Sequence, residues 1–286
     1  MKKISNLLVG LSLLATTAFS ADSQMDVPSA VPINVFEMDE NQIGVGYIQF
    51  GATLELEDDY YNDKIGDADF KSKGLILTLP KNQATPIGKM FELSYTVGTI
   101  DSSLKNNQFQ DSGKNYTNSY EKDGFYVGVR PAFSTELYKS DMFTVQNSTS
   151  LHLMLYSISG SFSVSHDGGG ANSSYKYDET NTGIGLKPTT VINGTYFPMK
   201  NLGLSVFGGL STFIALDYCS YSGDVGYEDD DVELNFQMAS IDPIYGFDVV
   251  LKGIFGENDT INLSSVFASK SADTSVETIV RYVFTF

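Results

Sequence analysis

The sequence lacks tryptophan and has one cysteine, and its 18 lysine and arginine residues face 35 aspartate and glutamate residues. The single Cys219 excludes an internal disulfide. A formal net charge of −17 makes the chain a poor nucleic-acid partner, because it would repel phosphate. Beyond the amino-terminal apolar stretch, no run approaches the roughly 20 residues that a membrane-spanning helix needs. A helical membrane protein is therefore excluded, whereas a soluble β-sandwich and a membrane β-barrel both stay open.

The amino terminus has the pattern of a secretory signal peptide. Two lysines follow Met1, an apolar segment covers 7–15, and a small-x-small triplet ends at Ser20. The apolar segment is too short for a membrane anchor. We predict a signal peptide over 1–20 and export of the remaining chain. Residues 21–41 contain two prolines and no alternation, which indicates a periplasmic tail, with an inserted plug as the alternative.

The rest of the chain alternates apolar and polar residues with a period of two, which is typical of β-strands. Leu151, Leu153 and Leu155, for example, alternate with polar or larger side chains. In the first segment Ile48 and Phe50 are expected on the same apolar face as these leucines. Each alternation alone is a weak signal, but ten in succession favour an all-β protein. The segments are roughly 43–57, 72–80, 90–100, 125–137, 143–165, 182–196, 202–217, 234–252, 260–269 and 277–286.

The connections between these segments alternate between long and short. The long ones are expected at 58–71, 101–124, 166–181 and 218–233, and the short ones at 81–89, 138–142, 197–201 and 253–259. In membrane β-barrels long outer loops alternate with short periplasmic turns along the chain. A β-sandwich is not expected to alternate its loop lengths in this way.

The second face of the alternating segments carries charges, and this decides which face points inward. An unpaired buried charge costs several kcal/mol, so this face cannot be the dry core of a soluble protein. Turned inward in a closed barrel, it can pair internally or touch water while the apolar face meets lipid. We predict an all-β, antiparallel up-and-down transmembrane β-barrel over 42–286, with ten strands and with eight or twelve as alternatives. The lumen is expected to hold Glu92, Arg130, Lys187, Asp242, Asp248, Lys252, Glu277 and Arg281.

The chain ends on an apolar and aromatic face formed by Val280, Tyr282, Phe284 and Phe286. In this respect the sequence resembles Gram-negative outer-membrane β-barrel proteins, whose last strand ends in an aromatic residue after alternating apolar ones. The resemblance implies that the protein is located in the outer membrane and that these four residues form its assembly signal. It also implies the barrel-assembly machinery, periplasmic chaperones, membrane lipid and lipopolysaccharide as partners.

An outer-membrane protease or lipid-modifying hydrolase is the less favoured alternative, because the motifs of three such enzyme families are not found. Omptin-like proteases, outer-membrane phospholipases and lipid A deacylases each need a histidine in a local motif. His152 and His166 match none of these motifs, so we expect a lumen residue and a loop residue respectively. We predict no catalytic residues, no cofactor and no metal site. The acidic run 228–231 is interpreted as a solvated loop, and divalent cation binding is kept as a hypothesis.

The expected lumen charges leave two functions open. A ten-stranded barrel is narrow, because its width grows with strand number. The charges therefore indicate either a narrow porin-like channel for small solutes or a plugged barrel with a structural or surface-interaction role.

Overall fold

A computed structural model describes residues 42–57, 64–79, 90–111, 114–167, 173–223, 232–238, 241–269 and 274–285. These residues form twelve antiparallel β-strands, and no helix among them is long and apolar enough to cross a membrane. The strands are β1 (Gln42–Glu57), β2 (Lys64–Leu79), β3 (Met90–Asp111), β4 (Lys114–Lys139), β5 (Phe143–Asp167), β6 (Ser173–Met199), β7 (Leu202–Ser211), β8 (Ile214–Gly223), β9 (Val232–Met238), β10 (Asp242–Lys252), β11 (Thr260–Ser269) and β12 (Thr274–Thr285).

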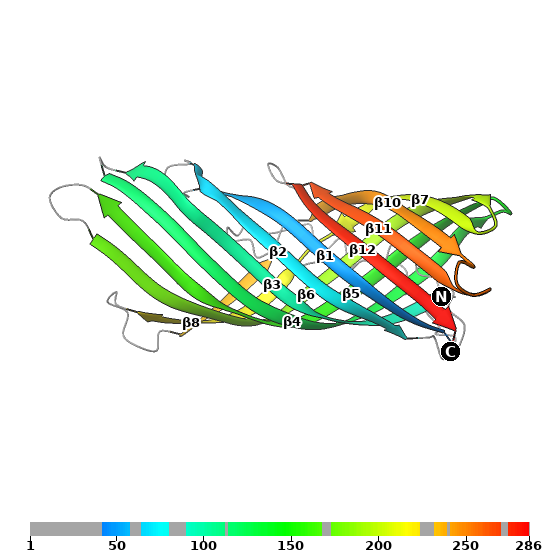
Figure 1. The fold of residues 1–286 in the computed structure, drawn as a ribbon, viewed down its shortest axis with the longest axis horizontal. Helices are drawn as coiled ribbons and strands as arrows, with labels where there is room; N and C mark the ends of the chain where they lie inside the picture. Colours follow the sequence, from blue (N-terminus) through cyan, green and yellow to red (C-terminus); the bar gives the residue numbers. More distant parts are fainter. Residues whose placement is uncertain are drawn as a thin grey trace, which may run out of the picture.

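Ten of these strands close into a barrel (Figure 1). Strands β1 to β7 pair in sequence order, β7 pairs with β10, and β10, β11 and β12 follow in order. The ring closes where β12 pairs with β1 over eleven residues, from Gln42 opposite Thr285 to Ala52 opposite Ser275. Closure satisfies the backbone hydrogen bonds without water, as the hydrocarbon layer of a membrane requires. The predicted ten-stranded barrel is confirmed.

Two of the predicted strands are interrupted halfway. The segment expected over 202–217 is divided at Thr212 and Phe213 into β7 and β8, and the segment over 234–252 is divided into β9 and β10. Long strand β6 pairs with β7 along one half and with β8 along the other. In the described part of the chain, β9 pairs with β8 alone. The ten-stranded ring is therefore complete at the end that holds β10 to β12.

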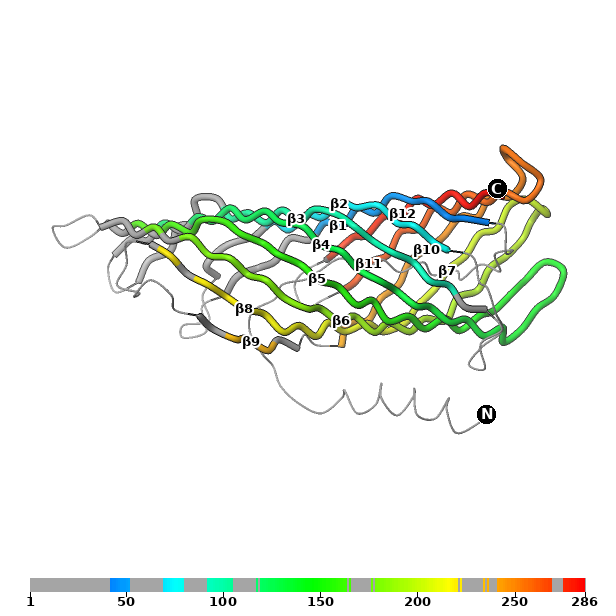
Figure 2. The backbone as a smooth tube through the Cα atoms, turned by 90° about the horizontal axis from the view of Figure 1, so that it is seen from below, coloured from blue at the N-terminus to red at the C-terminus, as the bar shows by residue number. Residues whose placement is uncertain are grey.

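Strands β3 to β6 extend far beyond the level where β10 to β12 end (Figures 1 and 2). This corrects the prediction of long loops at 101–124 and 166–181, since β3 continues to Asp111 and β6 begins at Ser173. The polar residues of these two segments pair with the neighbouring strands in the same way as the apolar residues. Polar side chains indicate that a strand is surrounded by water, but they do not end the strand. Only 112–113 separates β3 from β4.

The outer surface of the barrel is an apolar band. Cross-strand neighbours Val97, Val127, Leu155 and Ile184 are all exposed and form a continuous row over β3 to β6. On β4 the apolar outward residues run from Phe133 to Phe125, a length that suits the roughly 9–11 residues of a tilted membrane crossing. Aromatic side chains surround the end of the barrel where β1 begins and β12 ends, as is typical of a membrane interface. They include Tyr138, Phe143, Tyr196, Phe197, Phe255, Tyr282 and Phe284.

Strand β1 has the opposite orientation to the one predicted. Ile48 and Phe50 are 1% and 3% exposed and point inward, whereas Val45 and Tyr47 are 41% and 40% exposed. The prediction was wrong because both faces of β1 are apolar, so that alternation alone cannot separate lipid from interior. The interior thus contains apolar layers as well as charged ones. Ile48 packs there with Ile76 and Ile279.

Inward aromatic rings lie over glycines of neighbouring strands. The Tyr126 ring covers Gly98, and a Cβ at that glycine would lie 2.6 Å from the ring. The Phe213 ring covers Gly185 in the same way, at 2.7 Å. The absent side chains let the rings lie flat against the wall, and the rings of Tyr126, Tyr156 and Phe213 share one buried cluster with Phe50 and Phe70.

A charge within the apolar band is expected to destabilise the membrane-inserted barrel. Leu153→Arg, on the exposed face of β5, should lower the free energy of unfolding in liposomes by about 2–4 kcal/mol, as measured by guanidinium titration. The control Asp123→Arg, exposed beyond the band on β4, should leave it nearly unchanged. Equal effects of the two variants would contradict the assignment of the band.

The ring-over-glycine packing predicts that Gly185→Ala lowers the free energy of unfolding by about 1–3 kcal/mol, because the added methyl overlaps the Phe213 ring. Combining it with Phe213→Leu should recover part of the loss. Gly51→Ala is the matched control, since nothing lies within 4 Å of a Cβ at that position. Guanidinium titration in detergent micelles measures all three, and a loss at Gly51 as large as that at Gly185 would argue against the interpretation.

Candidate functional site: a buried charge network in the lumen

Three charged side chains meet inside the barrel near the end that carries the chain terminus. Glu92 on β3 accepts from Arg130 Nη2 through one oxygen and from Arg281 Nη1 through the other, each at 2.8 Å. All three are at most 2% exposed. Both carboxylate oxygens thus bind a guanidinium, and the hydrogen bonds are charge-assisted.

Neutral hydroxyls complete this network. Ser94 Oγ donates to Glu92 at 3.1 Å, accepts from Arg130 at 3.0 Å and lies 3.0 Å from Thr78 Oγ1. The buried charges therefore have polar neighbours on three adjacent strands, β2, β3 and β4. Such support is necessary, because a buried charge without partners costs several kcal/mol.

Arg281 reaches its partner across the closure of the barrel. It belongs to β12, and strands β1 and β2 lie between β12 and the β3 strand of Glu92. Gly46 of β1 is directly opposite Arg281. A Cβ at Gly46 would lie 2.7 Å from the Val280 carbonyl oxygen and 3.3 Å from the Arg281 Cα, so this part of the wall has no room for a side chain. Glycine at this position leaves the inner surface of β1 clear beside Arg281.

Further polar pairs fill the interior beside the triad. His152 Nε2 lies 2.9 Å from Thr96 Oγ1, and both residues are buried. On the opposite wall, Asp248 accepts from Ser264 at 2.8 Å and from the Asn262 side-chain amide. His152 on β5 thus reaches Thr96 on β3 across β4, whereas Asp248 on β10 is paired with side chains of the adjacent β11.

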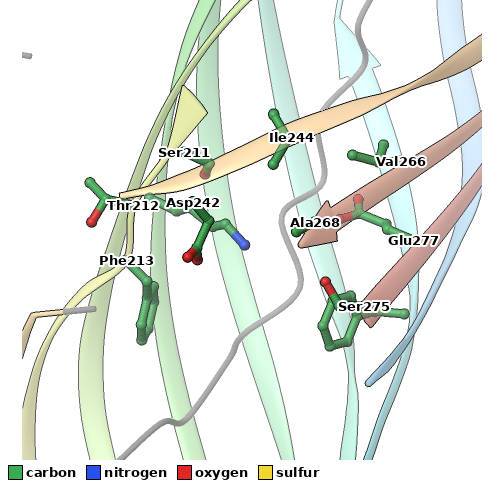
Figure 3. Close-up of a pocket in the computed structure, with 11 residues that line it drawn as sticks. Ser211, Thr212, Phe213, Asp242, Ile244, Val266, Ala268, Ser275 and Glu277 are labelled. Carbon is green, nitrogen blue, oxygen red and sulfur yellow. The ribbon is translucent and has the colours of Figure 1, made fainter. Parts of the chain in front are cut away.

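A small cavity lies where β7 gives way to β8 (Figure 3). Its volume is about 20 Å³, which accommodates a water-sized molecule and no larger ligand. The close-up shows Asp242, Glu277 and Phe213 pointing into the same space from three separate strands or their junctions. Its lining is mixed, with Phe50, Ile244, Val266 and Ala268 beside Lys187, Ser211, Thr212 and Ser275.

The eight charges that the sequence assigned to the lumen divide into separate groups. Glu92, Arg130 and Arg281 form the triad, and Asp248 belongs to the network with Asn262. A third group lines the cavity and consists of Lys187, Asp242 and Glu277.

Lys252 does not join the other charges. It is exposed at the end of β10, with its ammonium 5.3 Å from the centre of the Phe197 ring. Its position in the alternation is that of an inward residue, but β10 ends there and the side chain lies outside the lumen. The hydroxyl and amide partners Thr78, Ser94, Asn262 and Ser264 were not singled out from the sequence, although their alternation places them on the inward face.

The carboxyl-terminal residues occupy the outward face of β12. Val280 is exposed, the Tyr282 and Phe284 rings stack at 5.5 Å, and the Tyr282 hydroxyl donates to Asp259 of the neighbouring turn. Phe286 lies outside the described residues. Recognition of these residues by an assembly machinery stays a prediction.

The acidic, histidine and cysteine side chains of the described residues are dispersed. Among them, no group of three or more His, Cys, Asp or Glu side chains is arranged to hold a metal ion. The acidic run 228–231 lies outside the described residues, as do the predicted signal peptide 1–20 and the predicted tail 21–41. His152 is 2% exposed and bonded to Thr96, which fits a structural role.

No protein-family model matches the chain, and no curated protein matches it. Three similar solved structures are outer-membrane β-barrels. The translocator domain of the autotransporter NalP from Neisseria meningitidis is 11% identical and has a TM-score of 0.42, with 86% of this chain and 88% of that chain covered. The outer-membrane protease OmpT from Escherichia coli is 9% identical with a TM-score of 0.39, over 86% and 97%. A major outer membrane protein from Thermus thermophilus is 12% identical with a TM-score of 0.34, over 84% and 99%.

At such identities none of these functions transfers to this chain. Its own surfaces and interior have to indicate what it does.

Removing the central carboxylate is expected to destabilise the barrel strongly. Glu92→Gln leaves two buried guanidinium groups without this counter-charge and should lower the free energy of unfolding by about 3–5 kcal/mol. The triple variant Glu92→Leu, Arg130→Met, Arg281→Met removes all three charges and should lose less than Glu92→Gln alone. Guanidinium titration in detergent micelles measures both.

The matched control is Glu136→Gln. Glu136 pairs with Lys139 at 3.3 Å on the surface, where an ion pair contributes at most about 1 kcal/mol. If Glu92→Gln unfolds at the same denaturant concentration as this control, the triad does not hold the interior together.

Proposed function

We propose that the protein is an integral outer-membrane β-barrel with a closed lumen, whose role lies at the cell surface and not in solute conduction. The observation that carries this proposal is the buried bridge of Glu92 to Arg130 and Arg281. It joins strands β3, β4 and β12 through the interior of the barrel. An ion at this level would meet a carboxylate whose two oxygens are already bound to guanidinium groups, each at 2.8 Å.

The layers above the triad support the same proposal. Isoleucines from β1, β2 and β12 pack together inside the ring, and a buried aromatic cluster lies beyond them. Farther along, Lys122 pairs with Glu179 at 2.7 Å from neighbouring sides of the interior. Apolar side chains thus interrupt the charged lining, although Lys187, Asp242 and Glu277 line the small cavity beside the aromatic cluster. A pore that selects small solutes would need a continuous polar path.

Location in the outer membrane is supported by the apolar band, the aromatic residues at one end and the closed ring of strands. The predicted signal peptide and the aromatic terminal strand agree with this location. The interior networks indicate that the buried charges serve the fold, so no catalytic activity is proposed for them. For the parts of β3 to β6 that extend beyond the apolar band, a structural or surface-interaction role is proposed.

Planar-bilayer recording tests the proposal. The refolded barrel, inserted at a density that gives clear channels for an open porin, should show no discrete conductance steps. Insertion is verified on the same sample by the shifted migration of the unheated protein on a gel. Discrete steps of uniform size from the inserted wild-type barrel would contradict the closed lumen and favour the narrow channel.

A further inference from the structure

The inner wall of the barrel carries short polar side chains on the side centred on β6. They occupy inward positions of β4 to β7, and each is at most 7% exposed. Two pairs of them are hydrogen-bonded, Ser134 with Ser148 at 3.3 Å and Thr195 with Ser205 at 2.8 Å. We call the whole set the polar wall, and it consists of Ser134, Ser148, Ser150, Asn193, Thr195 and Ser205.

The pairing register shows which part of β1 is level with the polar wall. From Tyr47 of β1, the row of paired residues through β2 to β5 reaches Ile184 on β6. The row in the other direction, through β12, β11, β10 and β7, reaches Tyr196 on the same strand. The two rows cross equal numbers of strands in opposite directions around the tilted ring. Thr190, midway between their ends, is therefore level with Tyr47.

The charged triad lies on the β1 side of the lumen. Three residues closer to the end where β1 begins, Gly44 of β1 and Asn193 of β6 face each other across the ring. Ten strands about 4.8 Å apart and tilted by about 40° place these two backbones about 20 Å apart. Arg281 and Glu92 bond to each other beside β1, because their strands β12 and β3 flank β1 and β2. A serine side chain reaches only about 2.5 Å from its Cα, so the triad and the polar wall do not meet in the middle.

The Phe207 ring, next to the polar wall on β7, does not fill this space either. It covers Gly246 of β10, where a Cβ would overlap the ring, so the ring lies flat against the wall. It packs there in a buried cluster with Val191, Ile244 and Val266. The burial of the polar wall therefore requires another part of the chain in front of it.

The chain enters its first strand from inside the mouth of the lumen. Gln42 is 6% exposed and occupies an inward position of β1, in alternation with Gly44. Its side-chain amide donates to the backbone oxygen of Asn258 at 2.9 Å, in the turn between β10 and β11. The preceding segment 21–41, which is outside the described ranges, thus joins the barrel at this mouth.

The composition of this segment suits a narrow, dry lumen. Its acidic residues are confined to 22–26 and 37–40, and the stretch between them, VPSAVPINVF over 27–36, is uncharged. Ten extended residues span about 33 Å, enough to cross a barrel whose apolar band is about 25 Å tall. Pro28 and Pro32 have no backbone N–H to satisfy. Serine, threonine and asparagine side chains of the polar wall can donate to and accept from the remaining backbone groups, which would otherwise be buried without partners.

We infer that residues 27–36 run through the lumen as an extended plug, between the charged triad and the polar wall. The segment is then an inserted plug and not a free periplasmic tail. This inference rests on the proposed closed lumen and names the part of the chain that completes the closure. The acidic residues on either side of the uncharged stretch mark where the plug leaves the dry interior.

Labelling of a lumen cysteine tests the plug. The background is Cys219→Ser, and Ser148→Cys places a single thiol in the polar wall. With the full chain folded in detergent micelles, 2-aminoethyl methanethiosulfonate should react slowly. Deletion of 22–36 should raise the rate about tenfold or more, because the thiol becomes accessible to the reagent. Mass spectrometry follows the reaction, and the shifted migration of the unheated protein on a gel verifies folding.

The matched control is Asp141→Cys in the same background. Asp141 is exposed in the turn between β4 and β5, so its labelling rate should be the same with and without 22–36. Equally slow labelling of Ser148→Cys in both chains would mean that another occupant fills the lumen. Equally fast labelling would mean that water fills it. Either result would overturn the inference.

A disulfide scan in the full-length chain decides the matter if the deletion variant does not fold. Ser148→Cys is combined in turn with Val27→Cys, Val31→Cys and Val35→Cys, again with Cys219→Ser. At least one pair should form a disulfide under mild oxidation, because this bond needs Cα atoms within about 7 Å. Ser23→Cys, in the acidic end of the segment, is the control that should form none. No disulfide from any of the three pairs would contradict the plug.

Failure of this inference is distinguishable from failure of the closed lumen. If the full-length barrel is silent in the planar bilayer but the labelling rate does not respond to the deletion, only the plug is wrong. Conductance steps from the full-length barrel would instead contradict the closed lumen itself.

Discussion

Pairing of the last strand with the first is the interaction on which the whole structure depends. In a hydrocarbon layer an unpaired backbone amide or carbonyl has no water to bind, so only a closed ladder is stable there. Strands β1 and β12 provide this closure over eleven residue pairs. Once the ring is closed, the two faces of every strand have fixed surroundings. One face contacts lipid, and the other has to fill a narrow interior.

Filling that interior explains most of the inward residues. Charges occur where they can be paired from several strands, as Glu92 is with two arginines. Apolar and aromatic residues take the levels between, and glycines provide the space that the rings of Tyr126 and Phe213 need. The glycines of this chain are thus part of the packing and not only of the turns. Their role could not be recognised without knowing which residues face each other.

The sequence was informative where the two faces of a strand differ in polarity. Leu151, Leu153 and Leu155 are outward as predicted, and the closed ten-stranded barrel is confirmed. Alternation failed on β1, where Ile48 and Phe50 are inward but as apolar as the outward Val45 and Tyr47. The polar composition of 101–124 led to the wrong prediction of a loop there, because a strand that extends into water can be polar on its outward face. The pairing of Glu92 with Arg281, 189 positions apart, depends on the barrel closure and has no local signal.

Arg281 lies on β12, the last strand in chain order, yet it completes a network whose other members are on β3 and β4. A ribosome has therefore made all the strands from β4 to β11 before the carboxylate of Glu92 can acquire its second guanidinium. A product that stopped before β12 would keep one salt bridge, lack the seam strand and expose its edges. The buried acid therefore acquires both of its counter-charges only in a chain that includes β12 and has closed its seam.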